Sequence, residues 1–143
     1  YGWLGFLLLF FGSVLAGNLF SLWLYKNRPS YAAIGASGGV SGILFAAITL
    51  SPMSSIIIFP IPIPITSWIY ATLYFAYSVA MMLNPRHYDN TGHAAHLGGA
   101  ACGMAFAAAL TPTFVMENAL FIGIMSLPLC YLAYEILVNK RAR

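Results

Sequence analysis

Charged residues are scarce in this chain. Its 143 residues include six Lys and Arg and three Asp and Glu, so that only 6% of the sequence is charged while 61% is hydrophobic. About a quarter of the residues of an ordinary soluble domain are charged, and the scarcity here excludes a water-soluble fold. The net charge of +3 is too small to indicate a nucleic-acid partner.

Other absences narrow the class of protein. No stretch alternates in the manner of a barrel strand, so the apolar runs must cross the bilayer as helices. The two cysteines, Cys102 and Cys130, lie inside apolar runs and predict buried packing thiols rather than a disulfide framework or a metal site. The H-E-x-x-H signature of zinc proteases is also missing.

Five apolar segments are candidate spans, since a hydrocarbon core about 30 Å thick requires roughly 20 apolar residues. They cover residues 3–24, 35–50, 65–83, 92–110 and 113–138. Between the second and third segments, Pro60, Pro62 and Pro64 remove backbone donors and exclude a regular helix. The sequence therefore predicts an all-α, polytopic transmembrane helical bundle in contact with the lipid bilayer.

We expect one membrane domain over residues 1–143, with a core at 3–110 and an additional helix at 113–138. The chain begins with Tyr1 and enters an apolar run at once, without a charged region of the signal-peptide kind. We interpret it as the C-terminal part of a longer protein.

Two glycine-rich motifs open the second and fourth predicted spans. The first reads G-A-S-G-G-V-S-G from Gly35 to Gly42, and the second reads G-H-A-A-H-L-G-G from Gly92 to Gly99. Because consecutive spans alternate in direction, both helix starts face the same side of the membrane. A serine and a histidine at similar depth suit nucleophilic catalysis without any cofactor, with Ser37 as the nucleophile and His96 as its general base.

The backbone around Ser37 adds to this prediction. At the start of a helix the N–H groups lack helical partners, so those of Ser37 and Gly38 are expected to stabilise an oxyanion. Glycines at small-xxx-small spacing are expected to let the helix backbones approach closely. These packing glycines are Gly35, Gly38, Gly39, Gly42, Gly99 and Gly103.

Two alternatives accompany this assignment. G-x-S-G occurs twice, and Ser41 lies one helical turn after Ser37 on the same face; we favour Ser37 because it is nearer the helix start. His93 and His87 could suggest zinc together with His96, but no carboxylate or thiolate joins them at a familiar spacing, so we expect no metal.

The pairing of G-A-S-G with A-H-L-G-G two spans later resembles the rhomboid intramembrane serine proteases. The resemblance covers residues 3–110 and implies a serine endopeptidase that cleaves transmembrane protein substrates, with Ser37 as nucleophile and His96 as base. It also implies that the loop at 84–91 caps the active site. The aromatic residues of the third span, Trp68, Tyr70 and Tyr74, would form a lateral gate.

This chain departs from the family pattern in three ways. The H-x-x-x-N motif that supplies side-chain oxyanion donors is absent, so two upstream helices are expected to be missing. Many members carry an aromatic residue one turn after the serine, where this chain has Ser41. The predicted segment at 113–138 would be a seventh helix added after the core.

The side of the membrane to which the dyad opens stays undecided. All six Lys and Arg lie on the side of the dyad, which by the positive-inside rule faces the cytosol, whereas the family usually opens to the opposite side. We expect an integral multi-pass protein of a bacterial cytoplasmic membrane. The competing functions are a non-catalytic rhomboid-like protein that binds transmembrane clients, and a transporter that uses the proline-rich segment.

Overall fold

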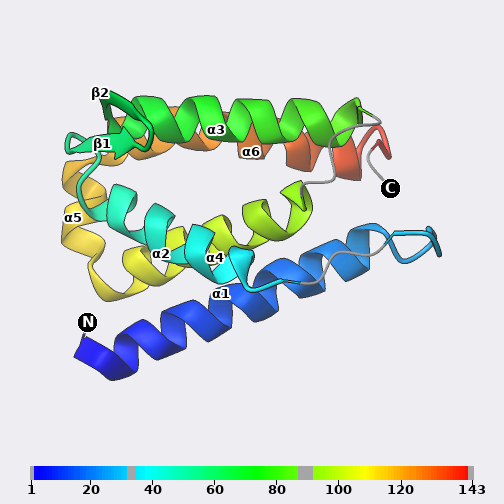
Figure 1. The fold of residues 1–143 in the computed structure, drawn as a ribbon, viewed down its shortest axis with the longest axis horizontal. Coiled ribbons are helices and arrows are strands. Elements are labelled where there is room, and N and C mark those ends of the chain that lie inside the picture. The colour runs from blue at the N-terminus through cyan, green and yellow to red at the C-terminus, as the bar shows by residue number, and fades with distance from the viewer. Residues whose placement is uncertain (1, 32–34, 87–91, 142–143) are drawn as a thin grey trace.

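Six helices and one β-hairpin make up the described part of the computed structural model, which comprises residues 2–31, 35–86 and 92–141 (Figure 1). The helices are α1 (Gly2–Leu24), α2 (Ser37–Leu50), α3 (Ser67–Leu83), α4 (His93–Leu110), α5 (Pro112–Glu117) and α6 (Ala119–Leu137). The strands are β1 (Ser55–Ile58) and β2 (Ile61–Thr66). The predicted helical membrane bundle is confirmed.

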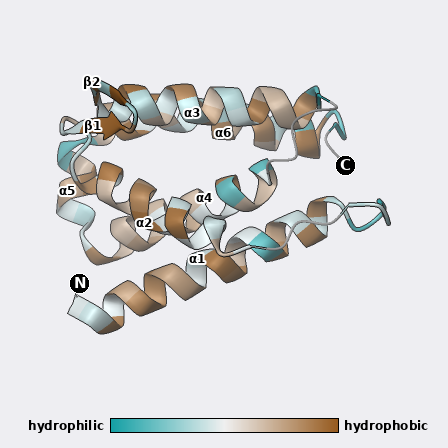
Figure 2. Ribbon diagram, viewed as in Figure 1, coloured by the Kyte–Doolittle hydropathy of each residue, from teal (hydrophilic) through white to brown (hydrophobic). Residues whose placement is uncertain are grey.

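The helices are long and apolar enough for a membrane protein. Within the described residues, α1, α4 and α6 meet the length and hydropathy of a bilayer span, and α2 and α3 are shorter apolar helices of 14 and 17 residues. Hydrophobic residues occur along all of the long helices (Figure 2), and many large apolar side chains are exposed. On α1, for example, Leu8, Phe11 and Leu15 are exposed, as expected where the solvent is lipid.

The predicted helix at 113–138 is wrong in one respect, because α5 and α6 divide it at Asn118. The Asn118 side-chain amide donates to the Phe114 carbonyl at 2.9 Å, and its backbone N–H donates to the same oxygen at 3.1 Å. These bonds satisfy a carbonyl at the end of α5 and let the chain change direction. The prediction that both cysteines are buried also fails, since Cys130 is exposed on the outer face of α6.

The bundle has two groups of helices. Helices α1, α2 and α4 pack against one another, and α3 lies alongside α6 (Figure 1). Aromatic rings join the groups, because Phe45 of α2 stacks on Phe75 of α3 with ring centroids 4.4 Å apart. The starts of α2 and α4 thereby face α3.

Glycines set the close approach of α2 and α4. A Cβ atom at Gly99 would meet the Gly38 carbonyl, and one at Gly103 would meet the Gly42 carbonyl. Gly39 is tightly packed against α1 instead, where a Cβ would come within 2.7 Å of Val14. Gly35 does not belong to this packing, because it precedes α2 and a Cβ there would meet only Ser37.

The proline-rich segment forms the hairpin. As predicted, it is not helical: β1 and β2 pair antiparallel, with Ile57 opposite Pro64. The hairpin and α5 lie at the end of the bundle opposite the chain's C-terminal end (Figure 1). This arrangement leaves the hairpin far from the glycine-rich starts of α2 and α4.

Candidate functional site

The structure brings Ser37 and His96 into direct contact. Ser37 is the first residue of α2 and is exposed, whereas His96 lies in the first turn of α4 and is partly buried. The Ser37 Oγ and His96 Nε2 atoms are 2.8 Å apart, a hydrogen-bond distance. Since the two residues are 59 positions apart in the sequence, this contact depends on the glycine-mediated packing of α2 against α4.

The other ring nitrogen of His96 contacts a tyrosine. The Tyr74 hydroxyl of α3 lies 3.1 Å from His96 Nδ1. The Tyr74 side chain is partly buried and its ring packs 5.3 Å from that of Phe45. The sequence analysis missed this contact. The signal was the alignment of the hydroxyl-bearing residues Tyr70, Tyr74 and Ser78 on one face of α3, at a spacing of four residues.

His93 and Ser41 each lie about one helical turn from a member of the dyad, His93 from His96 and Ser41 from Ser37. His93 Nδ1 lies 3.3 Å from the Ser78 hydroxyl, and its ring packs edge-on against Tyr77. Ser41, one turn further into α2, is buried. The hydroxyl at the His96 Nε2 atom is therefore that of Ser37, the serine favoured over Ser41 from the sequence.

The start of α2 orients backbone donors beside Ser37. The first helical bonds run from the Gly39 and Val40 N–H groups to the Ala36 carbonyl. The N–H groups of Ser37 and Gly38 precede these bonds, and the helix itself gives them no acceptor. They suit the oxyanion role predicted for them.

The other residues of the predicted gate lie away from the dyad. The Trp68 ring packs 5.6 Å from that of Phe121 in α6, and Tyr70 packs 5.9 Å from Tyr74. Tyr74 points toward His96 rather than outward, so we interpret it as a contact of the dyad and not as part of a lateral gate. Of the predicted cap at 84–91, residues 87–91 lie outside the described part of the chain.

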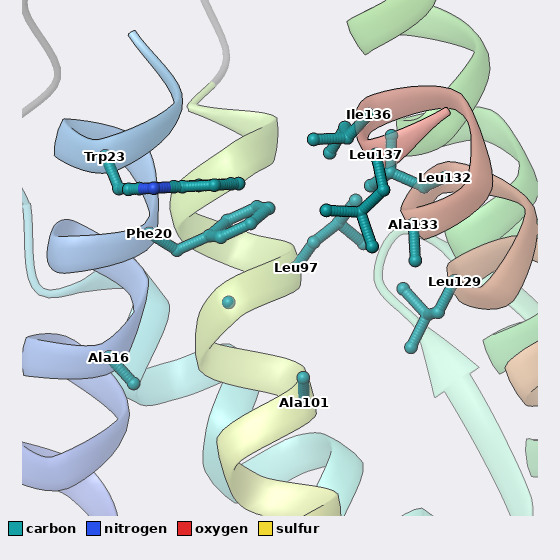
Figure 3. A pocket seen from close by; sticks show the side chains of 11 residues that line it. Ala16, Phe20, Trp23, Leu97, Ala101, Leu129, Leu132, Ala133, Ile136 and Leu137 are labelled. Carbon is teal, nitrogen blue, oxygen red and sulfur yellow. The ribbon is translucent and has the colours of Figure 1, made fainter. Parts of the chain in front are cut away.

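An apolar cavity of about 420 Å³ opens between α1, α4 and α6 (Figure 3). Phe20 and Trp23 line it from α1, and Leu97 lines it from α4. The opposite wall comes from α6, with Leu129, Leu132, Ala133, Ile136 and Leu137. None of the dyad residues lines the cavity, and its apolar walls offer no group for acid–base chemistry.

The positively charged residues in the described part of the chain gather at the end that carries the dyad. Lys26 and Arg28 follow α1, Arg86 follows α3, and Lys140 and Arg141 follow α6 (Figure 1). Among the described residues no three His, Cys, Asp or Glu are grouped as metal ligands. His87, a member of the zinc alternative, lies outside them.

Comparison with known proteins identifies relatives. The family model of the rhomboid domain matches residues 1–113. Rhomboid protein 1, mitochondrial, from Saccharomyces cerevisiae is 33% identical over 105 residues, which are 71% of this chain and 30% of that protein. The chain thus spans less than a third of the length of this relative. No solved structure matches.

Proposed function

The chain belongs to the rhomboid family, and from that premise we propose that it carries the catalytic dyad of an intramembrane serine endopeptidase. The observation that supports the proposal is the 2.8 Å contact between Ser37 Oγ and His96 Nε2. A serine hydroxyl is a weak nucleophile until a base removes its proton. His96 is within reach of that proton.

The proposed reaction has two steps. In the first, His96 Nε2 takes the proton of Ser37 while Oγ attacks the peptide carbonyl, and the C–N bond breaks as His96 returns the proton to the leaving amine. In the second, His96 takes a proton from water, which attacks the acyl ester, and the Ser37 Oγ–C bond breaks with return of the proton to Oγ. The N–H groups of Ser37 and Gly38 would stabilise the oxyanion in both steps.

The substrates are proposed to be transmembrane segments of other proteins. The dyad lies at the starts of two helices of a membrane bundle, so a scissile bond must reach it near the membrane boundary. The mitochondrial name of the yeast relative lends no support to the bacterial cytoplasmic membrane that we expected. The proposal therefore specifies an integral membrane protein and no particular organelle or organism.

A serine-reactive fluorophosphonate tests the proposal directly. We expect the probe to label the full-length protein in detergent or liposomes, and peptide mass spectrometry to find the adduct on Ser37, because only an activated serine reacts rapidly. Heat-denatured protein, in which the Ser37–His96 contact is lost, is the control. A folded protein that resists the probe but still binds transmembrane peptides would instead be the non-catalytic client-binding protein.

A further inference from the structure

The contacts of the dyad continue beyond His96. His96 Nε2 lies against Ser37, and its Nδ1 lies 3.1 Å from the Tyr74 hydroxyl. Ser78, one turn after Tyr74 on α3, lies 3.3 Å from the Nδ1 atom of His93. Tyr74 thus connects the base of the dyad, on α4, to α3.

The donor and acceptor atoms of the His96 ring determine the direction of these hydrogen bonds. For Nε2 to accept the Ser37 proton, a neutral His96 must carry its own hydrogen on Nδ1. That N–H then donates to the Tyr74 oxygen, 3.1 Å away. The contact therefore favours the one tautomer in which His96 acts as a base toward Ser37.

We propose that Tyr74 is the positioning residue of this site, which holds the His96 ring and its tautomer ready for proton transfer. In soluble serine proteases a buried aspartate does this for the histidine. A phenol oxygen accepts the same hydrogen bond without the cost of an ionised carboxylate inside a membrane. The inference rests on the proposed function, since it concerns the base of the same dyad.

The surroundings of Tyr74 make it a rigid support. Its ring packs against those of Phe45, Tyr70 and Phe75 at centroid distances of 5.3, 5.9 and 6.2 Å. The aromatic support of the histidine therefore comes from α3 in this chain.

Tyr74→Phe tests the inference because it keeps the ring and removes only the hydroxyl. We expect kcat for cleavage of a transmembrane substrate by the full-length protein to fall about tenfold to a hundredfold. KM should change less than about twofold, since the hydroxyl faces the base and not the substrate. Tyr134→Phe is the control: it removes an exposed tyrosine hydroxyl on α6 and should leave kcat unchanged.

Histidine NMR and the activity of the wild type distinguish a positioning role of Tyr74 from a folding defect of the variant and from failure of the proposed function. Nitrogen NMR of protein labelled at its histidine side chains should find His96 protonated on Nδ1, and a tautomer mixture in Tyr74→Phe, whether or not the protein turns over. An unchanged tautomer, or a kcat within about twofold of wild type, would overturn the role of Tyr74. A wild-type protein without cleavage activity would instead contradict the proposal that the protein is an endopeptidase.

The hairpin at the opposite end of the bundle supports a second, independent inference. It connects α2 to α3, and no charged residue lies between positions 29 and 85 of the sequence. Its large side chains point outward: Phe59 at the turn is 93% exposed, and Ile57 and Ile63 are 65% and 63% exposed. A two-stranded hairpin exposing such groups is at best marginally stable in water.

The prolines of β2 have no backbone N–H to satisfy, which suits the hairpin to surroundings poor in water. Pro64 pairs with Ile57, and a residue without an N–H is tolerated in a strand where its nitrogen faces away from the partner strand. Pro62 lies at the irregularity of the register between Ile57 and Ile58, and it too has no N–H. The two prolines therefore reduce the number of backbone donors that would be costly where water is scarce.

We infer that the hairpin lies in the lipid interface, with Phe59 and the exposed isoleucines inserted among the upper acyl groups. The hairpin connects two apolar helices, α2 and α3, and its strands are coloured as hydrophobic in Figure 2. The carbonyl groups of the outer edge keep the hairpin at the boundary of the hydrocarbon core rather than inside it.

Fluorescence quenching tests this placement. A Phe59→Cys variant of the full-length protein, with both native cysteines replaced by serine, is labelled with an environment-sensitive dye in liposomes. Brominated phospholipids should quench the dye at least about twofold more strongly than aqueous iodide does. A Lys26→Cys control in the charged loop after α1 should give the reverse order. Stronger quenching by iodide at position 59 would overturn the inference.

Discussion

Ser37→Ala is expected to abolish peptide-bond cleavage by the full-length protein. The substitution removes the Oγ atom, which lies 2.8 Å from His96 Nε2 and is the atom proposed to form the acyl intermediate. Activity should fall by at least about 10³-fold. The measurement is cleavage of a fluorogenic transmembrane peptide by protein reconstituted in liposomes.

Two companion variants locate the nucleophile and its base. His96→Ala should reduce cleavage as strongly as Ser37→Ala, because the two residues act as a unit and removing either disables it. Ser41→Ala should lower it by no more than about tenfold, since the ring nitrogens of His96 contact Ser37 and Tyr74 and not Ser41. Activity that survives Ser37→Ala but disappears with Ser41→Ala would assign the nucleophile to Ser41.

Gly99→Ala is expected to separate the dyad without touching either member of it. A Cβ at this position would come within 2.8 Å of the Gly38 Cα atom and closer still to its carbonyl, both of them backbone atoms that cannot turn aside. Helix α4 would have to move away from α2. We expect a loss of about 1–3 kcal/mol in stability, together with a larger loss of cleavage, because proton transfer requires the short Ser37–His96 contact.

Gly12→Ala and Gly123→Ala are the matched controls. Each lies within a long helix, and a Cβ there would meet nothing within 4 Å. Alanine is the better helix former by about 1 kcal/mol, so these variants should be as stable as wild type or more so. Thermal unfolding and cleavage measured in parallel provide the comparison. An active, stable Gly99→Ala protein would show that the close backbone approach is not needed.

The bundle was largely predictable from the sequence because the bilayer leaves few alternatives. Apolar runs of sufficient length must become helices in lipid, and Pro60, Pro62 and Pro64 had to interrupt them. The errors occurred where a local polar contact decided the structure. Asn118 ends α5 through bonds to the Phe114 carbonyl, which no apolar run predicts, and Gly35 falls outside α2 because the helix begins at Ser37.

Sequence alone determined which residues could form the dyad, because the two glycine motifs can be recognised without knowledge of packing. It also determined that both residues would face one side of the membrane, because consecutive spans alternate in direction. Only the tertiary structure decided what lies behind His96. The rotation of α3 about its axis depends on how Phe45, Tyr74 and Phe75 fit together. The hydroxyl-bearing residues Tyr70, Tyr74 and Ser78 share one face of α3, but their spacing does not say which neighbouring helix that face contacts.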